Sequence, residues 1–258
     1  RKIKMSISQF GIIISENEPL LNGAQKLVDT CSNHCVQAEI IKIEHINHKS
    51  LGLLPLCLYP LSNSDYLSSL APLLMRRGYY IINGNYHQQR FDKISMQACL
   101  QSAGIRVPEF YPMNLVSKIK ALMNTGMQFL AKPNCHLRKQ EILSRDDTLA
   151  RFQDSITVKG EYYAERFIDA ENEHKLYVVG EKIFFDYNKL DTRMNEIIQI
   201  TDGIRTVSKL EIFSFDLIQE TATHHLFVID VNPASAFYLA TDARIQFVQY
   251  VKSKLASL

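Results

Sequence analysis

The chain has 258 residues, of which 46% are hydrophobic and 22% charged, a composition typical of a globular protein with a packed core. Its net charge of +2, from 29 basic and 27 acidic residues, provides no overall attraction to nucleic acid or to a membrane surface. No apolar run reaches the roughly 20 residues of a membrane span, and the basic start RKIKMSISQF lacks the apolar core of a signal peptide.

Five scattered cysteines, an odd number without a CxxC pair, indicate reduced thiols and predict a cytoplasmic location. Cys31 and Cys35, with His34 between them, could suggest a metal site. Their spacing is explained more simply by one face of a helix, so no metal is expected there.

The first third of the chain alternates between predicted strands and helices. The expected segments are a strand at Phe10–Ser15, a helix from Pro19, a strand at Val36–Ile43, an apolar run at Leu51–Leu61, a helix at Ser64–Arg77 and a strand at Tyr79–Ile82. This order predicts a small parallel α/β domain over about residues 1–83. Neither G-x-G-x-x-G nor G-x-x-x-x-G-K-[ST] occurs in it, so no phosphate loop is assigned there.

The middle of the chain is predicted to mix helices and strands. The expected elements are helices at Gln89–Ala103, Val116–Asn124, Asp146–Gln153, Asn195–Leu210 and Thr241–Leu255, strands at Gln128–Lys132, near Lys139–Leu143 and at Tyr162–Phe167, and a hairpin at Lys175–Asp186. Asp92 and Lys93 would fall in the first turn of the first of these helices.

The segment Phe213–Pro233, FSFDLIQETATHHLFVIDVNP, predicts two strands joined by a polar turn. Strict alternation would place Asp230 and Asn232 on one face, together with the apolar Leu226 and Val228. If the turn is centred near Thr223, Asp216 lies opposite Asp230. Two carboxylates and a carboxamide then converge, a set that suits Mg²⁺ bound to phosphates. The alternative is an ordinary hairpin with acidic residues near its ends.

Six short motifs between Ile81 and Phe237 together resemble the ATP-grasp superfamily and, within it, the RimK-like peptide ligases. They are RFDK followed by L..AGI.VP, then AKP, AERFI, EHKLYVVG, FDLI and IDVNP, in the order that the family shows. The resemblance implies an α/β (α+β) protein with an N-terminal pre-ATP-grasp domain at 1–83 and an ATP-grasp domain at 84–258. The latter would comprise a small lobe at about 113–165 and a C-terminal lobe at about 166–258.

The same resemblance implies roles for individual residues. Lys93 and Lys132 match the lysines that contact ATP phosphates, and Lys175 stands where the family usually carries an arginine facing the transferred phosphate. Adenine contacts fall on four consecutive residues and the ribose contact on an acid, namely Glu165, Arg166, Phe167, Ile168 and Glu173. The metal ligands match Asp216, Asp230 and Asn232, and Arg193 is the one candidate for a basic group on the acceptor side.

The chain departs from the family after the second lysine. The run AKPNCHLRKQEIL contains no glycine, whereas the family usually has a glycine-rich loop there that covers the phosphates. Either the fold no longer turns over ATP, or residues of this loop are missing from the sequence.

These observations predict a ligase that uses ATP and Mg²⁺ to join a carboxylate to an amine through an acyl phosphate. Two Mg²⁺ ions are expected, with Mn²⁺ as a substitute, and the partners would be small-molecule or peptide substrates, without nucleic acid or membrane. The sequence leaves a homo-oligomer open. The alternatives are a small-molecule kinase similar to the inositol polyphosphate kinases and a nucleotide-binding protein without catalysis.

Overall fold

A computed structural model describes residues 9–15, 18–47, 50–61, 65–89, 91–112, 115–134, 141–143, 162–185 and 191–258. The chain folds into two compact units. Unit 1 comprises residues 1–90, 175–215 and 231–258, and unit 2 comprises residues 91–174 and 216–230. The division near residue 83 and the two lobes beyond it stay a prediction.

Unit 1 contains a parallel four-stranded sheet with helices between its strands. The strands are β1 (Phe10–Ile14), β2 (Ala38–Lys42), β3 (Cys57–Pro60) and β4 (Tyr80–Ile81), and the helices of this part are α1 (Glu18–Asn33), α2 (Asp65–Arg76), α3 (Gly84–Gln89) and α8 (Thr241–Leu255). The strand order is β2-β1-β3-β4, and every neighbouring pair is parallel. The α/β class that the sequence predicts for this region is confirmed.

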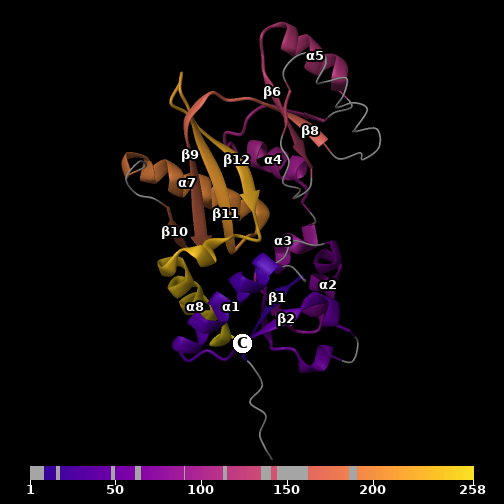
Figure 1. Cartoon of the computed structure of the whole chain (residues 1–258), viewed down its shortest axis with the longest axis vertical. Coiled ribbons are helices and arrows are strands. Elements are labelled where there is room, and N and C mark those ends of the chain that lie inside the picture. The colour runs from indigo at the N-terminus through magenta and orange to yellow at the C-terminus, as the bar shows by residue number, and fades with distance from the viewer. Residues whose placement is uncertain are drawn as a thin grey trace, which may run out of the picture. The chain divides into compact units, whose positions relative to one another are not determined.

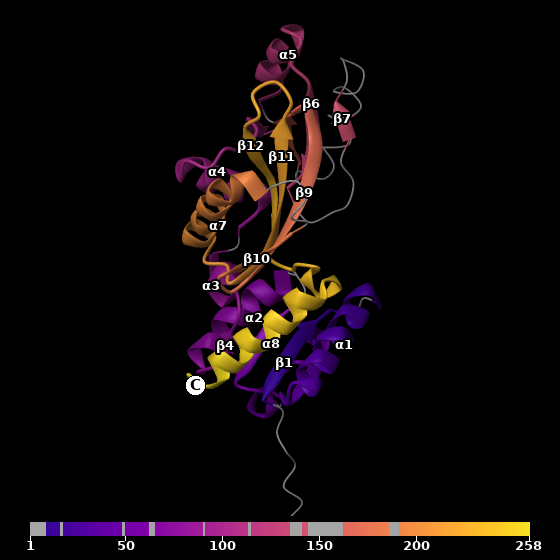
Figure 2. The ribbon, with the colours of Figure 1, turned by 90° about the vertical axis from the view of Figure 1, so that its left-hand side faces the viewer.

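Strand β1 is buried on both faces, which explains why its sequence FGIII is apolar throughout. Phe10, Ile12 and Ile14 pack into one cluster with α1 and α8, whereas Ile13 packs into a second cluster with α2. Figure 2 shows α1 and α8 beside β1. The sheet of unit 1 is therefore the middle layer between helices.

The C-terminal helix α8 completes the core of unit 1 through Phe247. The ring centroid of Phe247 lies 5.7 Å from that of Phe10, 5.3 Å from that of Tyr59 and 5.2 Å from that of Phe237. The sequence predicts the bounds of this helix but not its partners, because nothing local indicates that the last helix packs on the first strands.

Unit 2 contains an antiparallel sheet covered on one face by a helix. Its strands are β5 (Phe110–Pro112), β6 (Phe129–Pro133), β7 (Glu141–Leu143) and β8 (Tyr162–Arg166), in the order β5-β8-β6-β7, and its helices are α4 (Lys93–Ser102) and α5 (Val116–Asn124). Ile119 of α5 packs on Phe129, Ala131 and Ala164 of the sheet. Residues Leu130 and Lys132 alternate with these and therefore point to the opposite face.

A third sheet has the order β10-β9-β11-β12, and β9, β11 and β12 each run from one unit into the other. Its strands are β9 (Ala170–Val179), β10 (Lys182–Phe184), β11 (Ile212–Glu220) and β12 (Leu226–Asn232), and the helix α7 (Met194–Ser208) precedes β11. Short 3-10 turns lie elsewhere along the chain, at η1 (Ile43–His45), η2 (Leu51–Leu53), η5 (Asp191–Arg193) and η6 (Phe237–Leu239). Figure 1 shows β9, β11 and β12 side by side.

One predicted helix, Gln89–Ala103, is wrong in its first part. α3 ends at Gln89, and α4 begins only at Lys93. Asp92 is the N-cap, and its carboxylate accepts a hydrogen bond from the backbone N–H of Ser95 at 2.7 Å. The predicted helix at 146–153 lies outside the described residues. In the described part of the chain, no helix is long and apolar enough to cross a membrane.

We expect Phe247→Ala to lower the free energy of unfolding by about 3–5 kcal/mol, because it leaves a cavity among three aromatic rings. Urea denaturation followed by circular dichroism measures this loss. Leu239→Ala is the control, since 62% of Leu239 is exposed and its truncation should cost little. Equal effects of the two substitutions would contradict the packing of α8 on the sheet.

Candidate active site

Lys93 is the first residue of α4, and its position is fixed by a polar bridge to the end of β6. The side chain of Asn134 accepts a hydrogen bond from the N–H of Ile94 at 2.9 Å and donates one to the Asp92 carboxylate at 2.9 Å. The N-terminus of α4 is thus tied to the residue that follows Lys132 and Pro133 in the chain. This bridge keeps the two lysine-bearing elements of unit 2 together.

Lys132 is a buried lysine on β6. Only 4% of its side chain is exposed, and its Nζ forms an ion pair with the carboxylate of Glu165, which is 1% exposed. The same Nζ donates a hydrogen bond to the backbone carbonyl of Ile229 on β12 at 3.1 Å. Burial raises the pKa of the Glu165 carboxyl, and the charge of Lys132 opposes that rise.

Lys93 contacts the residue of β12 that follows Ile229. Its Nζ lies 3.4 Å from Oδ1 of Asp230, and the two side chains are 13% and 27% exposed. The two ammonium groups therefore meet consecutive residues of the same strand. The structure brings four predicted site residues of unit 2 together: Lys93, Lys132, Glu165 and Asp230.

Two further residues belong to this cluster and are missed by sequence reasoning. The side chain of Gln97 donates to the Glu165 carboxylate at 3.4 Å and to the carbonyl of Ile229 at 3.5 Å. Burial, followed by the charges of Glu165 and Asp230, raises the pKa of the Tyr163 hydroxyl. Gln97 could have been found, since it lies four residues after Lys93 on the same face of α4.

The predicted adenine segment begins at the end of β8. The N–H of Arg166 donates to the carbonyl of Glu109 at 2.7 Å, and the N–H of Phe167 donates to the carbonyl of Gln128 at 2.8 Å. Both N–H groups are therefore already bonded to backbone carbonyls of neighbouring segments.

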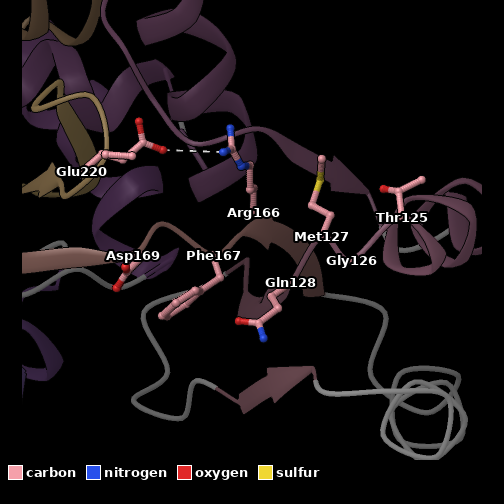
Figure 3. Close-up of a pocket in the computed structure, with 9 residues that line it drawn as sticks. Thr125, Gly126, Met127, Gln128, Arg166, Phe167, Asp169 and Glu220 are labelled. Carbon is pink, nitrogen blue, oxygen red and sulfur yellow. Dashed lines mark ion pairs between the residues drawn. The ribbon is translucent and has the colours of Figure 1, made fainter.

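A pocket of about 670 Å³ borders this segment in unit 2 (Figure 3). It is lined by Thr125, Gly126, Met127, Gln128, Arg166, Phe167, Asp169, Glu220 and Ala222. Nη2 of Arg166 lies 3.5 Å from Oε1 of Glu220 at its wall. The pocket includes two predicted adenine residues but neither of the lysines, so it is not the position of the charged cluster.

Asp216 lies on β11 and Asp230 on β12, as the sequence predicts. Leu226, Val228 and Val231 are buried, whereas Ile229 and Asp230 are both partly exposed. Burial along β12 is therefore not strictly alternating at Ile229 and Asp230. Asp216 is partly exposed, as is Asp230.

The donor set of the predicted metal site is small. Within the ranges that the structure describes, no three His, Cys, Asp or Glu side chains gather to hold a metal ion. The predicted ligands are the carboxylates of Asp216 and Asp230 and the carboxamide of Asn232, whose oxygen accepts the N–H of Ala234 at 3.0 Å. Two carboxylates and an amide oxygen fit Mg²⁺, which is commonly held by one or two carboxylates together with phosphate and water oxygens.

Three further predicted site residues, Glu173, Lys175 and Arg193, are not part of the cluster of Lys93, Lys132, Glu165 and Asp230 in the contacts described above. Glu173 and Lys175 are exposed residues of β9. Arg193, next to the start of α7, pairs with Glu196 at 2.6 Å. Their predicted roles toward ribose, phosphate and acceptor stay predictions, as does the missing glycine loop, since residues 135–140 of its segment lie outside the described residues.

No family model and no curated protein matches this chain. Solved structures do. A RimK-domain ATP-grasp protein from Sphaerobacter thermophilus superposes with a TM-score of 0.76 at 12% identity, covering 94% of this chain and 99% of that one. The ATP-grasp ligase PsnB, in complex with minimal precursor, Mg and ADP, gives a TM-score of 0.70 at 11% identity, with coverages of 96% and 98%.

D-alanine–D-alanine ligase from Bacillus anthracis gives a TM-score of 0.73 at 14% identity, covering 96% of this chain and 97% of that one. The chain therefore has the ATP-grasp fold over nearly its whole length, and the fold that the motifs predict is confirmed.

We expect Lys132→Met to lower the free energy of unfolding by about 3–5 kcal/mol near neutral pH, because it leaves the Glu165 carboxylate buried without its ammonium partner. The pKa of Glu165 in the folded protein is already raised, and the substitution removes the charge that opposes this rise. Stability linked to a raised pKa is present at low pH and is lost as pH increases through that pKa.

Urea unfolding of Lys132→Met at pH 5 and pH 8 should accordingly show the larger loss at pH 8. Lys120→Met on α5 provides the control. A loss that does not depend on pH would contradict the pairing of Lys132 with a buried carboxylate.

Proposed function

We propose that this protein is an ATP- and Mg²⁺-dependent ligase that joins a carboxylate to an amine. One observation carries the proposal: in unit 2, two ammonium groups and a carboxylate of β12 converge in a single cluster, formed by Lys93, Lys132 and Asp230. Among the structures that share the fold, PsnB is described as a ligase bound to a precursor, Mg and ADP, and another is a D-alanine–D-alanine ligase.

The lysines would bind the phosphates of ATP. Lys93 is more accessible than Lys132 and is paired with Asp230 across a 3.4 Å gap, a contact that is cheap to exchange. If Asp230 held a metal ion, the ammonium group of Lys93 would be available to a phosphate oxygen. Lys132 stays anchored by Glu165 and by the carbonyl of Ile229 and presents a fixed positive charge.

Asp216, Asp230 and Asn232 would hold the metal ion. Mg²⁺ bound there would neutralise phosphate charge. We propose two such ions, with Mn²⁺ as a substitute, and contacts of Glu173 to the ribose, Lys175 to the transferred phosphate and Arg193 to the acceptor. Glu165, Arg166, Phe167 and Ile168 would bind the adenine.

The reaction would proceed in two transfers. A carboxylate oxygen of the first substrate attacks the γ-phosphorus of ATP, and the bond to ADP breaks. The amine nitrogen then attacks the acyl carbon, phosphate departs with its electron pair, and the nitrogen loses a proton. The side chains contribute position and charge, without a covalent bond to the protein.

The test of the reaction class is a substrate-dependent assay. The purified chain is incubated with ATP, Mg²⁺, a panel of amino acids and peptides, and a panel of amines. ADP and phosphate should appear only when an acid and an amine are both present, with a product whose mass equals their sum minus water. ADP with a phosphorylated acceptor would instead indicate a kinase, and binding without turnover a nucleotide-binding protein.

We expect Asp230→Asn to remove most of the gain in ADP affinity that Mg²⁺ provides and to lower turnover by at least about 100-fold, since a metal-held phosphate contributes several kcal/mol to the transition state. Calorimetric titration with ADP, with Mg²⁺ and with EDTA, measures the first effect. Asp242→Asn in the first turn of α8 is the matched control. An unchanged response to Mg²⁺ in Asp230→Asn would remove the metal assignment.

A further inference from the structure

Asn83 follows β4 in unit 1 and is completely buried, with 0% of its surface exposed. Its carboxamide oxygen accepts the N–H groups of Glu211 at 2.8 Å and Ile212 at 3.0 Å. Its carboxamide nitrogen donates to the carbonyls of Ile212 at 2.5 Å and Pro233 at 3.3 Å. Its own backbone N–H donates to the Glu211 carboxylate at 3.0 Å.

These contacts use two lone pairs and two donors, the full capacity of an asparagine side chain. The backbone of Asn83 is left-handed, with φ of +62°, a conformation that asparagine tolerates better than most residues. An aspartate would lose both donors, and an alanine would leave four backbone groups without this partner. The position therefore requires asparagine on two separate grounds.

The partners of Asn83 mark one end of the strand pair that carries the predicted metal ligands. Ile212 is the first residue of β11, and Pro233 directly follows Asn232, the last residue of β12. By binding both, Asn83 sets the separation between the start of β11 and the exit of β12.

A second set of contacts fixes Glu211 itself. Its carboxylate accepts hydrogen bonds from the hydroxyls of Tyr80 and Tyr250 and lies 3.3 Å from Nζ of Lys254. Tyr80 belongs to β4, and Tyr250 and Lys254 belong to α8. Glu211, which binds the backbone N–H of Asn83, is thus itself held by β4 and α8. Asn83 therefore has little freedom to move with β12.

We infer that Asn83 is a positioning residue that holds the carboxamide of Asn232 in place for a divalent cation. The inference rests on the proposed function, in which Asn232 is a metal ligand. Asn83 would touch neither metal nor nucleotide. It would act by fixing the carbonyl of Pro233, the middle residue of the Asx turn in which the carboxamide oxygen of Asn232 accepts the N–H of Ala234 at 3.0 Å.

The test uses Asn83→Gly, which keeps the left-handed backbone and removes only the side chain. The matched control is Lys209→Gly, an exposed residue with φ of +58° near the same strand. ADP affinity is measured by calorimetry across a Mg²⁺ titration and again in EDTA. In Asn83→Gly we expect the Mg²⁺ concentration that gives the half-maximal gain in ADP affinity to rise about 10-fold or more. The ADP affinity in EDTA should change less than about 2-fold, because a displaced amide ligand weakens the binding of Mg²⁺ and not that of the metal-free nucleotide.

A normal Mg²⁺ response in Asn83→Gly, even with a lowered unfolding temperature, would show that Asn83 has a structural role alone and overturn the inference. Asn83→Asp, which keeps the two acceptor contacts, serves as a second variant if the glycine variant does not fold, and should shift the Mg²⁺ response in the same direction. A wild-type chain whose ADP binding ignores Mg²⁺ would instead overturn the proposed function.

Discussion

The buried ammonium group of Lys132 is the constraint on which the arrangement of unit 2 depends. A lysine that is 4% exposed cannot remain charged without close partners, because the cost of removing its charge from water is several kcal/mol. Glu165 supplies the opposite charge from the neighbouring strand, and the carbonyl of Ile229 supplies a further acceptor from β12. The ion pair and the hydrogen bond that the ammonium group of Lys132 needs therefore link the sheet of unit 2 to β12, the strand that carries Asp230.

The two lysines occupy unequal environments, and this difference suits different tasks. The pair of Lys93 with Asp230 is partly exposed, so breaking it costs on the order of 1 kcal/mol or less, whereas breaking the pair of Lys132 with Glu165 costs about 3–5 kcal/mol. The pair of Lys93 is thus the easier one to exchange, and Lys132 is held in one position. Under the proposed function, this difference would give a phosphate site one exchangeable and one permanent positive charge.

The sequence predicts those features that local patterns determine. The helix at Val116–Asn124 and the terminal helix at Thr241–Leu255 have the predicted bounds, because apolar spacing and flanking residues determine both ends. The sequence pattern misses the interruption before Lys93, although Asp92 has the residue type of an N-cap, because the apolar pattern continues through it. Helical spacing places Gln97 on the face of Lys93, but the partners of Gln97 and of Asn134 are 40 or more positions away, and no single-sequence pattern indicates those partners.

The surroundings of β12 show why residue order alone could not place the predicted metal ligands. Val228 and Val231 are buried, whereas Ile229 and Asp230 are partly exposed, so strict alternation does not describe the burial of this strand. The carbonyl of Ile229 accepts a hydrogen bond from Lys132, and Asp230 pairs with Lys93, so residues far away in the sequence determine what surrounds the strand at this point. Beyond the end of β12, Asn83 binds the carbonyl of Pro233, the residue after Asn232. An ionised carboxylate is tolerated at Asp230 because it is partly exposed and paired, and neither property follows from the alternation of the sequence.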